Sequence, residues 1–448
     1  MGHGNRRPWS LAAAPGRRIQ ADGSGKHKRV GHFRHPVRAA AEGQKLSFLE
    51  KRIRVFNRYL AAGKAQGLYC FMRDFGGSAG PRVTVAGREL VMLASNNYLG
   101  LTTRPEVLEA AAAALKRYGT GAGSVRMIGG TMDLHLRLEE RLAALAGAEA
   151  AITFTSGYAS NISVVSALVS GRDAVLMDRR AHASLYDACG LAGVKPELFA
   201  HNDIEDLRAR LAALPADKGR LVIVDGVYSV DGDIAPLDLI KRACDEAGAA
   251  LLVDEAHATG VLGPGGRGTP AHFGLEGRVD LVMGTLSKAL ASSGGFAAGS
   301  RDLVDYLRHH ARAFLFSTAL TPPDCAAALT AAEILLREPE LPEALRANSA
   351  RLRAGLRSLG YPATGDPTPI VPLLIGADFD AYRVALRLQE LGVYATPFIF
   401  PAVEKGRARL RLSVTAAHSP ADIDRALDAF AAVRPLVKES LERAGINT

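Results

Sequence analysis

The chain has 448 residues, of which 48% are hydrophobic and 23% charged, and its formal net charge is +9. This length is sufficient for a large core and predicts more than one domain. No apolar run approaches the roughly 20 residues that a membrane-spanning helix needs, so we expect no membrane span.

The positive charge is concentrated near the N-terminus. Residues 1–41 contain nine Lys or Arg and one acid, Asp22, so eight of the nine net charges lie there. The remainder is nearly neutral and offers no basic patch, so we expect no nucleic-acid partner. Arg, Gly, His and Pro dominate this segment, which predicts a disordered basic tail over 1–44. An organelle-targeting or nucleic-acid-binding arm is the alternative interpretation.

Metal and disulfide chemistry are not expected. The four cysteines are scattered, with no pair at metal-ligand or redox spacing, which predicts reduced thiols in a cytoplasmic protein. The group Asp231-Gly232-Asp233 lacks the ligand spacing of a calcium loop, so we interpret it as a turn.

The first regular elements are predicted to be helices and a hairpin. Amphipathic helices are expected at 46–61, 106–118 and 134–146. A hairpin is expected over 82–94, turning at Gly87. We group the first helix and the hairpin as an N-terminal segment, 45–100.

A repeat of strands and helices follows. Short apolar strands are predicted at 151–155, 174–177, 221–225, 250–254 and 280–283. Helices between them predict an α/β fold with a large parallel sheet. The turn Ser156-Gly157-Tyr158 opens a helix after the first of these strands, and backbone N–H groups at a helix start suit a phosphate. Two further strands, near 369–375 and 408–413, and a terminal helix are expected near the C-terminus.

Two residues that follow neighbouring strands indicate the chemistry. Asp254 ends a strand within ALLVDEAHATG, and His257 follows three residues later. Lys288 lies in GTLSKALASSGG, a loop rich in Thr, Ser and Gly. A carboxylate at a strand end can keep a pyridine nitrogen protonated, and an enclosed lysine amine can form a Schiff base. This order of Asp and Lys is therefore typical of a site for pyridoxal 5'-phosphate (PLP).

Seven short motifs are distributed along the chain. They are SNNYLG at 95–100, GTGAGSVR at 119–126, DRRAHAS at 178–184, DGVYSVDGD at 225–233, GPGGRG at 263–268, FST at 316–318 and RLR…AAH within 409–418. Together they resemble the motifs of the α-oxoamine synthase family of fold-type I PLP enzymes. The resemblance begins near residue 46 and implies a large, mostly parallel seven-stranded sheet domain, here 101–338, and a smaller C-terminal α/β domain, here 339–448.

The resemblance also implies the cofactor contacts of this chain. Lys288 would bind PLP covalently, Asp254 would pair with the ring nitrogen, and His182 would stack on the ring. With His257, these are the predicted catalytic residues. Further cofactor contacts are implied for Ser156, Gly157, Tyr158, Ser229, His257, Thr285, Ser287, Ser317 and Thr318.

Substrate contacts and subunit structure follow from the same resemblance. Ser317 and Thr318 would reach the phosphate of a partner subunit, so we expect a homodimer with shared active sites. The implied substrate contacts are Asn96, Ser124, His182 and Arg411. Arg411 would clamp the substrate α-carboxylate by a two-pronged hydrogen bond.

The implied reaction is a decarboxylative condensation. A small amino acid (serine, glycine or alanine) would react with a thioester of coenzyme A or acyl carrier protein to give an α-amino ketone, carbon dioxide and a free thiol. The residues alone indicate only that PLP activates an amine substrate, so an aminotransferase or an aldolase-like lyase is the alternative. A DNA-associated protein is a more distant one. HNDIEDLRARL is closer to serine palmitoyltransferase and FPAVEKGRARLR to glycine C-acetyltransferase, so the motifs do not select a substrate.

Overall fold

The structure is a computed structural model that describes residues 47–446, with the exception of 78 and 364. The predicted tail lies outside the described residues. The chain divides into two compact units, Met1–Tyr59 and Leu60–Thr448. Helix α1, Phe48–Ala65, begins in the first unit, where the Ser47 hydroxyl and the Glu50 carboxylate accept each other's backbone N–H groups. No helix of the described part is both long and apolar enough to span a membrane.

The second unit contains a seven-stranded sheet with strand order β4-β10-β9-β8-β7-β5-β6. Its strands are β4 (Ala150–Phe154), β5 (Ala174–Asp178), β6 (Glu197–Phe199), β7 (Arg220–Asp225), β8 (Ala250–Asp254), β9 (Leu281–Thr285) and β10 (Gly295–Gly299). Strand β10 runs antiparallel to both neighbours, whereas the pairs from β9 to β6 are parallel. The predicted α/β class with a large, mostly parallel sheet is therefore confirmed. Strands β6 and β10 are not predicted, because β6 is very short and GFAAG has low strand propensity.

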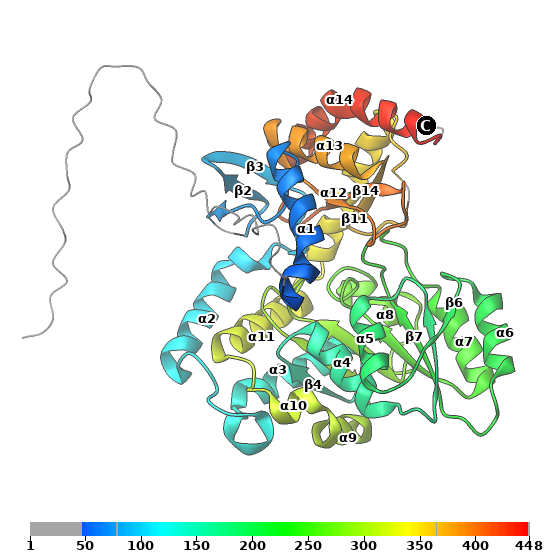
Figure 1. Ribbon diagram of the computed structural model, residues 1–448. Coiled ribbons are helices and arrows are strands. Elements are labelled where there is room, and N and C mark those ends of the chain that lie inside the picture. The colour runs from blue at the N-terminus through cyan, green and yellow to red at the C-terminus, as the bar shows by residue number, and fades with distance from the viewer. Residues whose placement is uncertain (1–46, 78, 364, 447–448) are drawn as a thin grey trace, which may run out of the picture. The chain divides into compact units, whose positions relative to one another are not determined.

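Helices cover both faces of this sheet (Figure 1). In β9, Leu281 and Met283 pack into one core cluster and Val282 into another, as alternation along a strand requires. Helices on the Leu281 face are α4 (Gly157–Leu168), α5 (Ala183–Leu191), α9 (Arg301–His310) and α10 (Arg312–Phe316). Helices on the Val282 face are α2 (Pro105–Tyr118), α3 (Asp133–Ala146), α6 (Ile204–Ala213), α7 (Leu237–Ala247) and α11 (Pro322–Arg337). The short α8 (Thr269–His272) follows β8.

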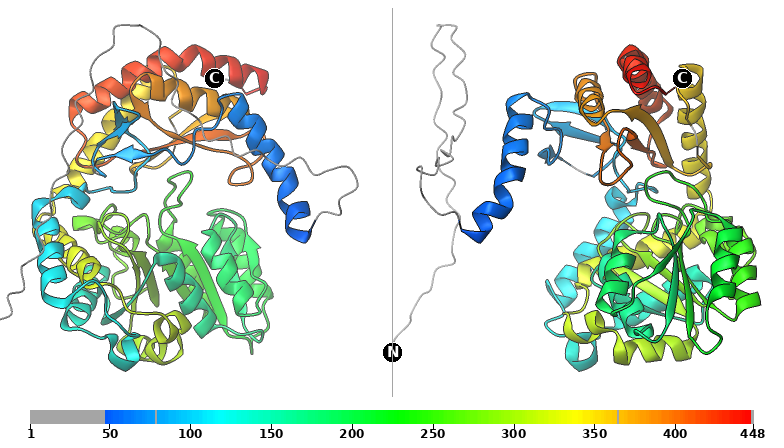
Figure 2. Two further views of the ribbon diagram at one scale, coloured as in Figure 1. Left: turned by 60° about the vertical axis from the view of Figure 1, so that its left-hand side comes forward. Right: turned by 45° about the vertical axis from the view of Figure 1, so that its right-hand side comes forward.

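The C-terminal part forms a smaller α/β layer. An antiparallel sheet with the order β11-β14-β13 consists of Ile370–Gly376, Ala408–Ser413 and Thr396–Phe398. Its apolar side chains share one core cluster with α12 (Leu341–Ser358), α13 (Asp378–Glu390) and α14 (Pro420–Arg443). Figure 2 shows these three helices beside the sheet. The predicted smaller C-terminal α/β domain is thus present, while its boundary at 338/339 stays a prediction.

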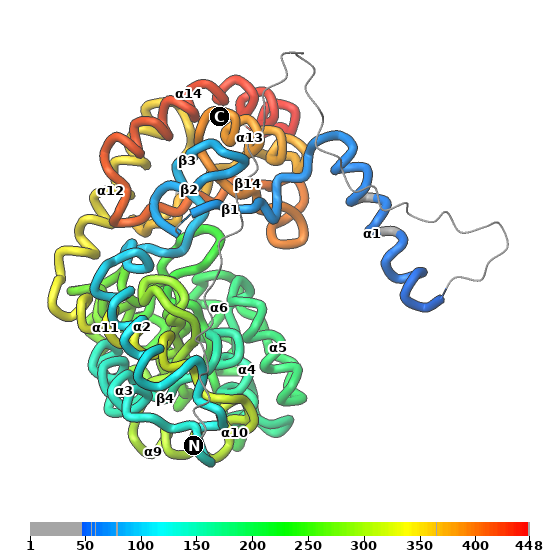
Figure 3. Tube along the Cα trace, turned by 90° about the vertical axis from the view of Figure 1, so that its left-hand side faces the viewer, coloured from blue at the N-terminus to red at the C-terminus, as the bar shows by residue number. Residues whose placement is uncertain are grey.

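A third sheet joins segments that lie far apart in the sequence. Its order is β1-β2-β3-β12, with bounds Phe75–Gly76, Arg82–Val85, Arg88–Met92 and Val393–Tyr394. Strands β2 and β3 form the predicted antiparallel hairpin around Gly87. Strand β3 pairs in parallel with β12, which places the hairpin beside the C-terminal layer (Figure 3).

The register of the large sheet positions the loops that follow its strands. Asp225 of β7 pairs with Asp254 of β8, and Asp254 pairs with Met283 of β9. These three parallel strands therefore end side by side at one edge. Ligands of open α/β sheets bind outside the carboxyl ends of the strands, so this edge is where a site is expected.

A buried ion pair ties the loop after α2 to the edge of the sheet. Both side chains of Arg126 and Glu139 are buried, and their atoms meet at 2.7 and 3.1 Å. The Glu139 carboxylate also accepts the backbone N–H of Thr153 in β4 at 3.0 Å. Every partner of this carboxylate is a donor, so its removal would leave a buried, uncompensated arginine.

We predict that Glu139→Ala lowers the free energy of unfolding by about 3–5 kcal/mol, because the Arg126 charge loses its buried partner. Chemical denaturation of the purified protein measures the change. Asp424→Ala is the control, since its ion pair with Arg351 is exposed and should contribute about 1 kcal/mol or less. Equal losses in the two variants would contradict the assigned role of the buried pair.

Candidate active site

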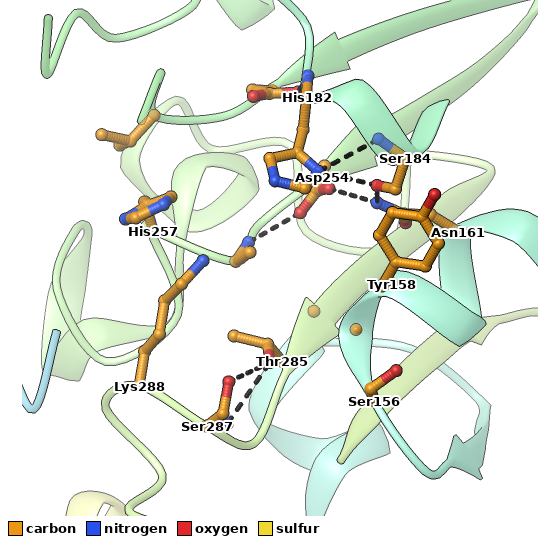
Figure 4. A pocket seen from close by; sticks show the side chains of 15 residues that line it. Ser156, Tyr158, Asn161, His182, Ser184, Asp254, His257, Thr285, Ser287 and Lys288 are labelled. Atoms are coloured by element: carbon orange, nitrogen blue, oxygen red, sulfur yellow. Dashed lines mark hydrogen bonds between the residues drawn. The ribbon is translucent and has the colours of Figure 1, made fainter. Parts of the chain in front are cut away.

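A cavity of about 260 Å³ opens at the carboxyl edge of β7, β8 and β9. Figure 4 shows the side chains around it, which come from the carboxyl ends of β4, β5, β7, β8 and β9 and from the segments that follow them, including the starts of α4 and α5. The predicted site residues that line it are Ser156, Gly157, Tyr158, His182, Asp254, His257, Thr285, Ser287 and Lys288. The fold therefore brings together nine side chains or backbone groups that are spread over more than a hundred positions of the sequence.

One end of the cavity is suited to a phosphate. Ser156 caps α4, its hydroxyl accepting the Ala159 N–H at 3.0 Å, and the first N–H groups of the helix have no helical acceptor. The Thr285 and Ser287 hydroxyls lie 2.8 Å apart on the facing loop. A Cβ at Gly157 would lie 3.1 Å from the Thr285 side chain, so a larger residue would crowd this end.

The carboxylate of Asp254 is held at the opposite end by two donors. Its Oδ1 accepts the Ala256 N–H at 2.9 Å, and its Oδ2 accepts the Asn161 side-chain amide at 2.7 Å. The residue is buried. Two fixed donors leave the carboxylate in one orientation, from which it can accept a further hydrogen bond from a cationic ring N–H.

His182 is the N-cap of α5 and presents an exposed ring to the cavity. Its Nδ1 lies 2.7 Å from the Ser184 hydroxyl and accepts the Ser184 backbone N–H at 3.3 Å. Its own backbone N–H is donated to Asp225 at 3.2 Å. The ring is therefore anchored along one edge while its face stays free, as a ring-stacking role would require.

Burial and the charges around the cavity shift the pKa values of two groups that line it, Lys288 and Asp225. Burial and the positive charge of Arg411 lower the pKa of the Lys288 amine to about 8, although Asp254 and Asp225 oppose the shift. Burial, followed by the nearby Asp254 carboxylate, raises the pKa of Asp225 well above its usual value. A lysine amine with such a pKa is partly neutral near neutral pH, which a nucleophile or a general base needs.

A second group of residues extends the site toward the C-terminal layer. Arg411, buried on β14, donates from Nη2 to the Asn96 side-chain carbonyl at 2.8 Å and to the Tyr98 hydroxyl at 3.1 Å. Tyr98 in turn contacts Nδ1 of His257 at 2.6 Å. Nε of Arg411 is buried without a hydrogen-bond partner among the described residues. The predicted substrate contacts Asn96 and Arg411 are thus in contact with each other and linked to the cavity.

Besides Asn96 and Arg411, which contact it only through other residues, four further predicted site residues do not line this cavity. Ser229 lies in the turn after β7, and Ser124 accepts the Ala319 backbone N–H through its carbonyl at 3.1 Å. Ser317 and Thr318 follow α10, and Thr318 is exposed and bridged to Val125. Their roles stay predictions.

The structure also adds residues that the sequence does not single out. Asn161, Ser184 and Asp225 line the cavity, and Asn161 donates to both Asp254 and Ser184. The position of Asn161, one turn into the helix that follows the phosphate-suited turn, is a possible signal. It is weak, because an Asn in a helix carries no indication of a partner 93 residues away.

Comparison with known proteins identifies the family. The model of aminotransferase class I and II matches residues 88–430. Serine palmitoyltransferase of Sphingobacterium spiritivorum is 41% identical over 85% of this chain and 95% of its own length. 8-Amino-7-oxononanoate synthase 1 of Bacillus subtilis (strain 168) is 45% identical over 78% of this chain and 89% of its own.

The chain belongs to the α-oxoamine synthase family. A solved structure of a serine palmitoyltransferase variant from S. paucimobilis, with a bound PLP–myriocin aldimine, supports this at 32% identity and a TM-score of 0.85. It covers 88% of this chain, and all of that protein is matched. The resemblance found in the motifs is confirmed, and the protein is a PLP-dependent acyltransferase of fold type I.

The donor set of the cavity fits PLP. The helix start and the two hydroxyls suit its phosphate, the Asp254 carboxylate suits its ring nitrogen, and the Lys288 amine suits its aldehyde. When bound here, PLP supplies a sink for the electron pair left at Cα of an amino acid. Tyr158 lines the cavity, but its hydroxyl is donated to Asp187, which leaves its ring as the contact surface.

PLP bound covalently through Lys288 should give the protein a visible absorption band, which makes it yellow. We predict that this band forms, when PLP is added to the cofactor-free protein, at a rate that rises with pH around a midpoint of about 8, because only the neutral Lys288 amine reacts. Arg411→Gln should raise this midpoint, since a positive charge that disfavours the ammonium is lost. Asp254→Asn should lower it for the opposite reason. Stopped-flow absorbance measures the rates.

The reaction of PLP with a free lysine derivative at each pH is the control, since it removes the contribution of the titration of PLP itself. Lys288→Ala should form no such band at any pH. A midpoint near 10.5, the value of a solvated lysine, would contradict the assigned environment of Lys288.

Proposed function

We propose that this protein condenses a small amino acid with an acyl thioester and releases carbon dioxide and a free thiol. The Lys288 amine with its lowered pKa, placed in one cavity with the Asp254 carboxylate, supports PLP chemistry on an amine substrate. The observation that carries the choice of reaction is the match of most of the chain to serine palmitoyltransferase and 8-amino-7-oxononanoate synthase. The alternatives left open are serine, glycine or alanine as the amino acid and coenzyme A or acyl carrier protein as the thioester carrier.

Lys288, Asp254 and Arg411 have different proposed roles in this reaction. Lys288 would remove the Cα proton, because its amine is partly neutral near neutral pH and lies in the cavity. Asp254 would keep the cofactor ring nitrogen protonated and so strengthen the electron sink. Arg411 would bind the substrate carboxylate through the donors it has left, since Nη2 is already shared by Asn96 and Tyr98.

We also propose that the active enzyme is a homodimer. Ser317 and Thr318 do not line the cavity of their own chain, and Thr318 is exposed. Phe316, which precedes Ser317, is 73% exposed, and Ile128 is 85% exposed. The two segments that carry these residues meet at the backbone bridge between Val125 and Thr318. Large apolar side chains that are this exposed favour burial against a partner.

A cytoplasmic location is also proposed. It rests on the four cysteines, which are all buried, free thiols.

The function is tested with carboxyl-labelled serine, glycine and alanine, each with coenzyme A thioesters of increasing acyl length. We expect labelled carbon dioxide and free thiol in equal amounts, both requiring amino acid and thioester together. Transfer of the amino group to a keto acid without loss of the label would contradict the proposal and favour an aminotransferase.

Asp254→Asn tests the proposed role of the carboxylate in a separate measurement, the exchange of the Cα hydrogen. It keeps the shape of the side chain and should still bind PLP, because the phosphate contacts and Lys288 are unchanged. Exchange of the Cα hydrogen with deuterated water should fall about 10³-fold, since the charge that favours the protonated ring is lost. Near-normal exchange would mean that the Asp254 carboxylate does not face the ring nitrogen.

The dimer is tested by sedimentation equilibrium of the wild type and of Phe316→Asp. We expect the wild type to sediment as a dimer and the variant to dissociate at concentrations where the wild type does not, because a charge replaces a buried apolar contact. Phe379→Asp, at a residue of α13 that is 62% exposed, is the control and should leave the mass unchanged. An active wild-type monomer would contradict the shared site.

A further inference from the structure

Tyr98 lies between two residues with predicted roles, and its own role is not predicted from the sequence. Its hydroxyl oxygen is 2.6 Å from Nδ1 of His257 and 3.1 Å from Nη2 of Arg411. The Asn96 carbonyl oxygen lies farther away, at 3.4 Å. The side chain is buried, with 1% of its surface exposed. Water therefore does not compete for these contacts, and their directions can be worked out.

The direction of each hydrogen bond follows from what the groups can donate. An arginine nitrogen can only donate, so the Tyr98 oxygen accepts from Arg411. The hydroxyl has one hydrogen to give, and the contact at 2.6 Å is far better than the one at 3.4 Å. Tyr98 therefore donates to Nδ1 of His257, which must be unprotonated to accept.

The protonation of the His257 ring is then fixed. Burial, together with the positive charges of Lys288 and Arg411, lowers the pKa of His257 well below its usual value, so the ring is neutral. A neutral imidazole carries one proton, which must be on Nε2. Nε2 makes no hydrogen bond with any residue that the structure describes, and His257 lines the cavity. The ring thus offers one N–H donor to whatever occupies the cavity.

We propose that Tyr98 is a positioning residue that fixes His257 as the tautomer protonated on Nε2. Through its second hydrogen bond, it also holds the His257 ring at a fixed position relative to Arg411. With Nδ1 occupied by Tyr98, the ring can only donate toward the cavity, through Nε2, so it selects an acceptor there, such as a deprotonated ring oxygen of PLP. The same hydroxyl accepts from the arginine that is expected to bind the substrate carboxylate. Tyr98 therefore couples the cofactor side of the site to the substrate side.

The tautomer is tested by nitrogen NMR of the cofactor-free protein with ¹⁵N-labelled histidine. The His257 signals are assigned as those lost in His257→Gln. We expect wild-type Nδ1 to show the shift of an unprotonated ring nitrogen and Nε2 that of a protonated one. In Tyr98→Phe the ring should move toward the other tautomer or a mixture, because Nδ1 has lost its donor.

Tyr361→Phe is the matched control. Tyr361 is also buried, and its hydroxyl donates to the Phe430 carbonyl at 2.7 Å in the C-terminal layer. Its loss should not change the His257 signals. A protonated Nδ1 in the wild type would overturn the proposal without any variant, and so would an unchanged tautomer in a folded Tyr98→Phe.

A second readout uses the holoenzyme. If His257 no longer donates to the cofactor ring oxygen, the pH at which the visible band changes should move in Tyr98→Phe and stay in Tyr361→Phe. We expect kcat/KM to fall about tenfold, the effect of one lost hydrogen bond, with part of the loss in KM for the amino acid because Arg411 loses a partner. An unmoved spectral transition would overturn the coupling to the cofactor.

The inference rests on the proposed function for the identity of the cavity occupant, but the NMR experiment needs neither PLP nor turnover. Failure of the condensation assay with the expected tautomer would therefore count against the function alone. The unexpected tautomer with normal condensation would count against the role of Tyr98 alone.

Discussion

The site depends on the register of three parallel strands. Asp225 and Asp254 end β7 and β8 and are paired neighbours, and Asp254 also pairs with Met283, two residues before the end of β9, so the loops that follow start from one edge. Helices cover both faces of the sheet, and its apolar side chains are buried in alternation on the two sides. A slip of one residue would exchange the two faces of a strand, so the packing fixes the register and the register fixes the site.

Within that frame, the chemistry depends on a small set of buried charges. The Lys288 amine lies in a cavity with the Asp254 and Asp225 carboxyl groups, and Arg411 acts on it from the C-terminal layer. Arg411 and burial lower its pKa, whereas the carboxyl groups limit the shift. The amine is therefore close to half neutral near pH 8, as the two roles proposed for Lys288, binding the cofactor and moving a proton, would require.

Three segments supply the residues for which we propose substrate contacts, together with their neighbours. The turn after β3 provides Asn96 and Tyr98, the loop after β8 provides His257, and β14 provides Arg411. Their side chains form one hydrogen-bonded group in which each member restricts the next. The pairing of β3 with β12 and of β11 with β14 holds these segments in place, so the hairpin and the C-terminal layer contribute to the site as well as to the core.

The sequence by itself determined the family, the cofactor and the residues that end the central strands. Periodicity, caps and strand-end carboxylates are local properties, which is why Asp254, Lys288 and the Ser156 cap could be read directly. Tertiary structure alone decided which groups meet. The Tyr98–His257 contact joins residues 159 positions apart, and the Arg411–Asn96 contact joins residues 315 apart. The tertiary structure also leaves Ser229 and Thr318 outside the cavity. Such contacts depend on strand register and on the packing of whole layers, which no local pattern of residues encodes.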